Sequence, residues 1–314
     1  MNISKSCDSK TIADGPAFLG IGAQRAGTSW VHSMLSMNPE IWLPPIKELH
    51  FFDMYLPDGS KAAKYGEHLD GRFRSYARIL LNRQISSIQQ ARELGNIVKF
   101  DLLSGIGFPS IKRYKGLFAG ASKSGNCPGE ITPAYATLTT DQVRYVRQVL
   151  GPYLRVFYII RDPMERMWSH LTKDRRKAKF YCRRDNSFEY QIRFLNSEGF
   201  RLRTSYASTI ENWRSVFGSE NFKLLFFDDI AKNGKELVYE IEKFIGVNHN
   251  SSDVVLPPQN SYKNSGEKIP KQLLCELARI SLIECKNLKE YTDNEYVDIW
   301  IERASQALVD ERCV

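Results

Sequence analysis

The sequence predicts an α/β fold in which helices flank a central parallel sheet, with a helical insertion and further helices toward the C-terminal end. Two observations lead to this prediction. Short apolar runs alternate along the chain with segments of helical periodicity. In addition, the run at 154–160, LRVFYII, is apolar almost throughout and rich in β-branched and aromatic residues. This composition is typical of a parallel strand that is buried on both faces.

Apolar runs and helical periodicity place the individual elements. Strands are expected at 17–22, 96–100, 154–160 and 222–227. Helices are expected at 28–37, 111–119, 141–150, 163–173, 235–245 and 270–286. Residues 55–90 are polar and only partly helical, so we interpret them as an insertion over the ligand face. Residues 248–268 are rich in Asn, Ser, Pro and Lys, and we expect them to form a mobile loop.

The size and composition of the chain suit one large domain. It has 314 residues, of which 42% are hydrophobic and 25% are charged. We expect a single domain at 16–314, preceded by a polar, disordered leader at 1–15. No apolar run approaches the ~18 residues of a membrane span, and the leader lacks the apolar core of a signal peptide. A cytoplasmic protein is therefore expected.

Cysteine spacing and net charge constrain the ligands. The six cysteines include no Cys-x-x-Cys pair, and no histidine cluster has the spacing of a zinc site, so free thiols and no bound metal are expected. The formal net charge of +8 has two interpretations. The basic residues either make the surface soluble or line a basic cleft for a nucleic acid, an anionic nucleotide or an acidic glycan.

The glycine-rich turn after the first predicted strand is a candidate anion site. Gly22 and Gly27 allow the backbone to curl around a phosphate, and the first N–H groups of the next helix have no partner within that helix. Arg25 adds a guanidinium, and Thr28 and Ser29 add hydroxyl groups. The glycine spacing is that of the P-loop, but Thr28 stands where the P-loop lysine would be. This disfavours an NTPase, and a plain strand-to-helix turn remains the alternative.

Residues 18–35, FLGIGAQRAGTSWVHSML, resemble the loop of the sulfotransferases that binds 3′-phosphoadenosine 5′-phosphosulfate. The resemblance implies a P-loop-like fold. It also implies that the 5′-phosphate is held by Arg25, Ala26, Gly27, Thr28, Ser29 and Trp30. Relatives carry a lysine where this chain has Arg25. Because arginine keeps the charge but does not readily release a proton, we expect charge stabilisation rather than proton donation at this position.

The strand predicted at 154–160 leads into a second candidate nucleotide element, RDPMERMWS. Arg161 stands at the strand end, and Ser169 follows about two helical turns later. The pair could hold one phosphate, or Arg161 could instead pair with Asp162 or Glu165. The segment resembles the 3′-phosphate-binding element of the sulfotransferases, in which a serine follows a strand-end arginine at the same distance.

Between these elements, Lys47, Glu48 and His50 can supply the chemistry of sulfuryl transfer, which requires proton removal from the acceptor and stabilisation of negative charge. On an extended segment, alternation places Glu48 and His50 on one side and Lys47 on the other. The sequence KELHFF resembles the Lys-Glu-x-His-Phe-Phe motif of the heparan-sulfate-type O-sulfotransferases. The resemblance implies Glu48 as catalytic base, His50 as its partner and Lys47 as a sulfonate contact. His50 as the base is the alternative.

The same resemblance adds four further site residues. The stretch GEITPAY is similar to a Thr-Pro-x-Tyr stretch that follows a central strand in the relatives. Glu130 and Tyr135 are therefore expected to line the acceptor site or to brace the base, with a core role for Tyr135 as the alternative. Tyr206 resembles a position that touches the nucleotide. Lys263 lies in a late loop where the relatives close over the 3′-phosphate.

These motifs predict a sulfotransferase that moves a sulfuryl group from 3′-phosphoadenosine 5′-phosphosulfate to an acceptor by in-line displacement. The acceptor is expected to be a hydroxyl group of a glycan or small molecule, with an amine as the second choice. We expect no metal and no nucleic-acid partner, and a monomer or homodimer. Two rivals remain: a P-loop-type phosphotransferase or NTPase, and a non-catalytic anion-binding protein.

Overall fold

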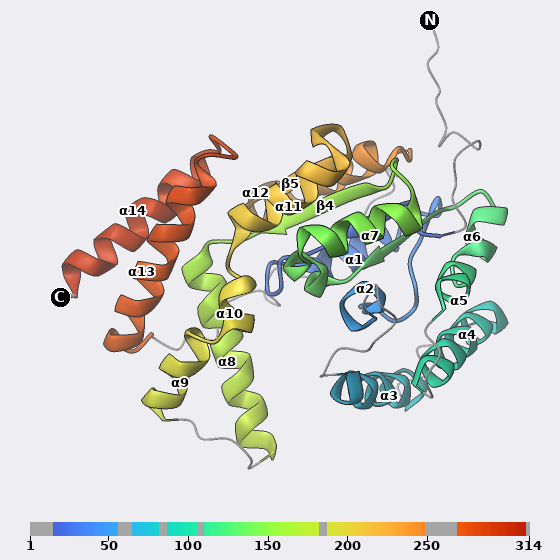
Figure 1. Ribbon diagram of the computed structural model, residues 1–314, viewed down its shortest axis with the longest axis horizontal. Coiled ribbons are helices and arrows are strands. Elements are labelled where there is room, and N and C mark those ends of the chain that lie inside the picture. The colour runs from blue at the N-terminus through green and yellow to red at the C-terminus, as the bar shows by residue number, and fades with distance from the viewer. Residues whose placement is uncertain are drawn as a thin grey trace, which may run out of the picture.

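Figure 1 shows the computed structural model of the chain, which describes residues 15–55, 65–81, 87–105, 110–181, 187–248 and 269–311. Within these ranges, five strands form one sheet with the order β2-β3-β1-β4-β5. The strands are β1 (Phe18–Gly20), β2 (Ile41–Trp42), β3 (Cys127–Ile131), β4 (Arg155–Ile160) and β5 (Phe222–Phe226). Every pairing between them is parallel, so the predicted α/β fold with a central parallel sheet is confirmed.

Helices cover both faces of this sheet. Alternate residues of β4 point to opposite faces: Tyr158 belongs to one apolar cluster, and Phe157 and Ile159 belong to another. The first cluster includes side chains of α7 (Thr140–Leu150) and α11 (Tyr206–Phe217), and the second includes side chains of α1 (Thr28–Leu35) and α12 (Asp228–Ile245). This two-sided burial explains why the β4 sequence is apolar almost throughout.

The helical insertion lies at the end of the molecule opposite the C-terminal helices (Figure 1), and the Trp42 side chain of β2 donates to Glu93 in it. It consists of α3 (Tyr65–Leu81) and α4 (Ile88–Gly105), followed by α5 (Ile111–Gly116) and α6 (Ala119–Lys123). The strand predicted at 96–100 is wrong, because these residues belong to α4. Its buried side chains are Leu94, Ile97, Phe100 and Asp101, which recur every three or four residues and therefore face the core from a helix.

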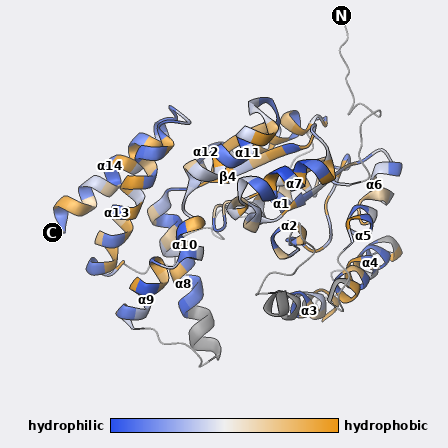
Figure 2. Ribbon diagram, viewed as in Figure 1, coloured by the Kyte–Doolittle hydropathy of each residue, from blue (hydrophilic) through white to orange (hydrophobic). Residues whose placement is uncertain are grey.

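The C-terminal helices pack against the helix that follows β4. That helix, α8 (Pro163–Tyr181), shares an apolar cluster with α13 (Lys271–Leu288) and α14 (Glu295–Asp310), which lie at the opposite end from α3 and α4 (Figure 1). Two short helices, α9 (Phe188–Leu195) and α10 (Glu198–Leu202), complete this cluster. Hydrophobic and hydrophilic residues alternate along α13 and α14 (Figure 2), as in helices with one buried face.

Several smaller features bear on the sequence-based expectations. Among the helices described, none is both long enough and apolar enough to cross a membrane. Cys285 is a buried free thiol, but Cys275 is in a disulfide, which corrects the expectation of free thiols at that position. The remaining helix, α2 (Phe51–Met54), is short and follows the predicted catalytic residues directly. Because the strands are parallel, the loops after their carboxyl ends meet at one edge of the sheet, where the candidate site lies.

Candidate active site

The glycine loop connects β1 to α1 and shapes the N-terminal end of that helix. Gly27 precedes the helix with a φ of 83°, and a Cβ atom there would lie 2.5 Å from the Ile230 side chain. Glycine is therefore required both by the backbone conformation and by the close packing. The first hydrogen bond of the helix runs from the Val31 N–H to the Gly27 carbonyl oxygen. The N–H groups of Thr28, Ser29 and Trp30 thus lack helical partners, as in an anion-binding helix terminus.

Two of the predicted contributors in this loop act only through the backbone. The side chains of Ala26 and Trp30 are buried, and Trp30 belongs to the apolar cluster of α1 and α12. Their predicted contact with a nucleotide can therefore involve main-chain groups only. By contrast, Ser29 is exposed and presents its hydroxyl group at the surface.

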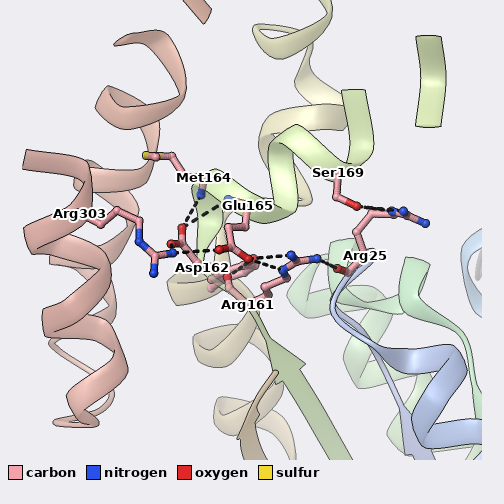
Figure 3. A network of polar contacts seen from close by, with 8 residues as sticks. Arg25, Arg161, Asp162, Met164, Glu165, Ser169 and Arg303 are labelled. Atoms are coloured by element: carbon pink, nitrogen blue, oxygen red, sulfur yellow. Dashed lines mark hydrogen bonds and ion pairs between the residues drawn. The ribbon is translucent and has the colours of Figure 1, made fainter. Parts of the chain in front are cut away.

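Arg25 lies between the two residues predicted to hold one phosphate. Its Nε and Nη2 atoms donate to Ser169 Oγ at 3.1 and 2.9 Å (Figure 3). Arg161 lies on the other side, with Nη1 3.5 Å from the Arg25 carbonyl oxygen. Arg161 also pairs with Glu165, through an Nη2–Oε2 distance of 2.7 Å. The pairing of Arg161 with Glu165, considered as the alternative, is thus present, while Arg161 and Ser169 approach each other only across Arg25.

Tyr206 contacts the backbone of Arg161 from the core and does not face the glycine loop. Its side chain is fully buried, and its hydroxyl group donates to the Arg161 carbonyl oxygen at 2.9 Å. In the present structure the hydroxyl group of Tyr206 is used by Arg161, and the contact of Tyr206 with the nucleotide stays a prediction. The ring of Phe227 lies 4.4 Å from the Arg161 guanidinium and adds a cation–π contact.

The three predicted catalytic residues lie together beside the glycine loop. Lys47 Nζ is 3.1 Å from Glu48 Oε1, and it donates to Thr28 Oγ1 and Ser29 Oγ at 3.2 and 3.0 Å. His50 Nε2 is 3.6 Å from Glu48 Oε2. Lys47 therefore connects the anion-binding helix terminus to the carboxylate of Glu48.

The backbone around these residues is not extended, contrary to the expectation of simple alternation. Glu48 and His50 have φ angles of 66° and 57°, in the left-handed region that side chains other than glycine seldom adopt. The side chain of the intervening Leu49 is buried in the core, and the turn allows this burial while Glu48 and His50 stay outside it. As a result Glu48 and His50 do share one side, as predicted, but Lys47 reaches the same carboxylate instead of pointing away.

Hydrogen bonds from the insertion and the sheet hold this turn in place. The Glu48 N–H donates to the Ile131 carbonyl oxygen at the end of β3, at 3.2 Å. Arg72 Nη1 donates to the carbonyl oxygens of Lys47 and Glu48 at 3.2 and 3.4 Å. Arg72 is itself fixed by Asp101, with an Nε–Oδ2 distance of 2.7 Å. A strained backbone persists only where the surrounding structure constrains it, and these contacts supply that constraint.

The charges of this group favour an ionised Glu48 and a protonated His50. Burial would raise the pKa of Glu48, but His50 and Lys47 outweigh it and lower that pKa to about 2. Burial would lower the pKa of His50, but hydrogen bonds and charges from Asp53 and Glu48 raise it to about 9. At neutral pH the site therefore holds a carboxylate between two cations. This favours Glu48 over His50 as the proton acceptor.

Glu130 and Tyr135 lie in the core beneath the turn formed by Lys47, Glu48 and His50, and Tyr135 contacts the residue that follows it. Both side chains are buried, which favours the bracing role over the acceptor-site role, and the two remain alternatives of the prediction. The Tyr135 hydroxyl donates to Glu130 Oε1 at 2.8 Å and accepts from the Phe51 N–H at 2.9 Å. Tyr114 and Thr132 also donate to Glu130, at 2.5 and 2.6 Å. The contacts of Tyr135 therefore favour the alternative of a core tyrosine with a satisfied hydroxyl.

An electropositive region continues along α8 from Ser169. Burial lowers the pKa of His170 to about 2, assisted by the positive charges of Arg166, Arg203, Lys173 and Arg25. Four cations, Arg166, Arg203, Lys173 and Arg25, therefore act on the ring of His170. His170 directly follows Ser169, which accepts from Arg25.

Two residues that contact the predicted catalytic residues were not predicted from the sequence, and one predicted residue lies outside the described ranges. Asp53 is 2.7 Å from His50 Nδ1, and its spacing of three residues on a helix could have indicated the pair. Arg72 comes from the polar insertion, where no local pattern distinguishes it from its neighbours. Lys263 lies outside the ranges that the structure describes, as does most of the predicted loop at 248–268. Nowhere in the described ranges do three or more His, Cys, Asp or Glu side chains form a group that could hold a metal ion.

Comparison with known proteins gives this geometry a family context. The model of the sulfotransferase family matches residues 16–251. In structure, the chain is similar to a sulfotransferase from Alicyclobacillus acidocaldarius, with a TM-score of 0.59 and 21% identity over 90% of this chain and 98% of that one. It is also similar to the sulfotransferase domain of the Synechococcus PCC 7002 olefin synthase, with a TM-score of 0.50 and 14% identity over 89% and 97% of the two chains. No curated protein matches the chain in sequence.

Proposed function

Because this chain belongs to the sulfotransferase family, we propose that it transfers the sulfuryl group of 3′-phosphoadenosine 5′-phosphosulfate to a hydroxyl group of a glycan or small molecule. One observation carries the proposal. Lys47 bridges the hydroxyl groups of Thr28 and Ser29 to the carboxylate of Glu48. A phosphosulfate bound at the helix terminus would therefore have its sulfur beside a base.

The donor would be held at two anchor points. The N–H groups at the start of α1, with Arg25, suit the 5′-phosphate, because they combine unsatisfied donors with a positive charge. Arg161 and Ser169 suit the 3′-phosphate, since they flank Arg25 on its two sides. Binding would redirect Arg25 and Arg161 from their present partners to the phosphates.

The chemical step would proceed by in-line displacement. Glu48 accepts the proton of the acceptor hydroxyl, whose oxygen forms a new bond to sulfur. The bond between sulfur and the bridging oxygen breaks, and the electron pair leaves with the 5′-phosphate of adenosine 3′,5′-bisphosphate. Arg25 and Lys47 stabilise the charge on the leaving phosphate and on the sulfuryl oxygens.

Lys47 would also make the strength of the base depend on the donor. In the present structure His50 and Lys47 together lower the pKa of Glu48 to about 2, in spite of its partial burial. A carboxylate with so low a pKa is a weak proton acceptor. When Lys47 turns toward a sulfuryl oxygen, Glu48 loses one of its two cationic partners, and its pKa rises. The base would thus become effective when the donor is in place.

The rival functions are less consistent with the same residues. An NTPase requires a lysine after the second glycine of the loop, and this chain has Thr28 there. A non-catalytic anion-binding protein would have no need for a carboxylate and an imidazolium beside the anion site. A hydroxyl acceptor is preferred to an amine because Glu48 can remove the proton of a neutral hydroxyl group as it attacks.

The test is a transfer assay with radiolabelled donor and a panel of glycan, phenol, alcohol and amine acceptors. We expect a labelled product with at least one hydroxyl acceptor, no requirement for Mg²⁺, and binding of adenosine 3′,5′-bisphosphate in calorimetry. Mg²⁺-dependent binding of ATP without any binding of adenosine 3′,5′-bisphosphate would refute the proposal. Steeply salt-dependent binding of polyanions without transfer would favour the non-catalytic rival.

A further inference from the structure

The ion pair between Arg161 and Glu165 continues into the C-terminal helix α14 (Figure 3). Arg303 Nη1 lies 3.0 Å from Glu165 Oε1 and 2.6 Å from Asp162 Oδ2. Glu165 therefore has one oxygen on Arg161 and the other on Arg303. Arg303 lies beyond residue 251, where the match to the family model ends. The contact thus connects the proposed donor site to a part of the chain that the family pattern does not include.

Glu165 occupies the side of Arg161 that is best suited to a phosphate. Both Nε and Nη2 of Arg161 donate to Glu165 Oε2, at 3.2 and 2.7 Å. This edge of a guanidinium is one that can bind a phosphate through two parallel hydrogen bonds. A 3′-phosphate at Arg161 must therefore displace the Glu165 carboxylate or share the guanidinium with it.

The local charges would oppose an incoming phosphate if Arg303 were absent. Three acidic residues, Asp162, Glu165 and Asp228, surround the position, and the charge of Arg303 acts on each of them. Asp162 is almost fully buried and accepts the Met164 N–H at 2.8 Å. Removing Arg303 would take away the counter-charge that lies 2.6 Å from Asp162 and 3.0 Å from Glu165, so the negative charge beside an incoming phosphate would increase.

We propose that Arg303 is a positioning residue of the donor site, which neutralises Asp162 and Glu165 and retains Glu165 when Arg161 turns to the 3′-phosphate. The inference rests on the proposed function, because it takes Arg161 as the phosphate ligand. The C-terminal helices would then contribute to donor affinity without touching the donor. We expect donor binding to depend on Arg303, and we expect the transfer step at Glu48 to be independent of it.

The test measures binding of adenosine 3′,5′-bisphosphate by calorimetry in the full chain. Arg303→Gln should raise the dissociation constant by about 10-fold or more, since two carboxylates lose their counter-charge. Arg303→Lys should have a smaller effect. Glu165→Gln should restore affinity when combined with Arg303→Gln, and by itself should bind more tightly than the wild-type chain. In transfer assays Arg303→Gln should raise the KM for the donor and leave kcat and the KM for the acceptor unchanged.

The matched control is Arg279→Gln, on α13. Its side chain is 45% exposed, as is that of Arg303, and the same charge is lost, but its ion pair is with Glu276. We expect this control to bind as the wild-type chain does. A wild-type chain that fails to bind adenosine 3′,5′-bisphosphate would overturn the proposed function and this inference with it.

The inference alone fails if the wild-type chain binds and Arg303→Gln binds equally well. It also fails if Glu165→Gln does not rescue Arg303→Gln, because a purely structural loss would not be repaired by removing a second charge. Should Arg303→Gln not fold, the Glu165→Gln variant decides. Affinity equal to or below that of the wild-type chain would overturn the inference.

Discussion

Arg72 connects the helical insertion to the turn at Lys47–His50. Its replacement by methionine tests separately what Arg72 contributes to the stability of the protein and to the rate of transfer. The side chains of Arg72 and Asp101 are only 5% and 3% exposed, and their charged atoms are 2.7 Å apart. Arg72→Met removes this ion pair and leaves the Asp101 carboxylate with its hydrogen bond from the Tyr76 hydroxyl. It also removes the donor to the carbonyl oxygens of Lys47 and Glu48.

The expected cost is large because the pair is buried. Breaking a buried ion pair on one side destabilises a protein by about 3–5 kcal/mol, since it leaves a charge without a partner in a dry environment. Combining Arg72→Met with Asp101→Leu removes both charges and should recover about half of this loss or more. Activity should not recover, because neither variant restores the donor to the catalytic turn. We expect transfer to fall by about 10-fold or more in both, as Glu48 loses its orientation.

Urea denaturation gives the free energy of unfolding, and the transfer assay gives kcat. Arg144→Met is the matched control, because Arg144 lies 2.6 Å from Asp141 but the two side chains are 66% and 87% exposed. Its effect on the free energy of unfolding should stay below about 1 kcal/mol. The reasoning is refuted if Arg72→Met costs no more than this control, or if activity returns together with stability in the double variant.

Further predictions concern the site itself. Glu48→Gln should leave binding of adenosine 3′,5′-bisphosphate nearly unchanged while transfer falls by ~10²-fold or more. If transfer survives in Glu48→Gln and is lost in His50→Ala, then Glu48 is not the base. Because the pKa of His50 is raised from 6.5 to about 9, its contribution to stability should be complete below about pH 6.5 and lost as the pH rises through 9; NMR titration of the ring checks this, and a midpoint near 6.5 contradicts it. Tyr135→Phe should lower the free energy of unfolding by about 1–3 kcal/mol, because the buried Phe51 N–H and Glu130 each lose a partner; a loss below about 0.5 kcal/mol in urea denaturation would contradict this.

Features that depend on local pattern were accessible from the sequence. Strand β4 is recognisable because both of its faces are buried, which leaves a continuous apolar run. The glycine loop is recognisable because a tight turn before a helix requires glycine at Gly27, whatever the rest of the fold. The Lys47–His50 segment is recognisable because its chemistry is concentrated in four consecutive residues. In each case the physical cause lies within a few residues along the chain.

Long-range packing settled the remaining questions. Residues 96–100 have the composition of a strand, but they form part of α4 because their apolar side chains meet the core at helical spacing. The sequence could not decide between a ligand contact and a core role for Tyr135, and in the structure the hydroxyl groups of Tyr206 and Tyr135 are used by Arg161 and by Phe51.

The partners of the charged residues come from distant parts of the chain. Ser169 binds Arg25 across 144 residues, and Arg303 reaches Asp162 across 141. Sequence could place each charge but not its counter-charge, because an ion pair depends on distance in space and on the exclusion of water. The sequence therefore sufficed to indicate the family and the candidate residues, whereas only the folded chain showed which side chains contact Glu48, Arg25 and Arg161.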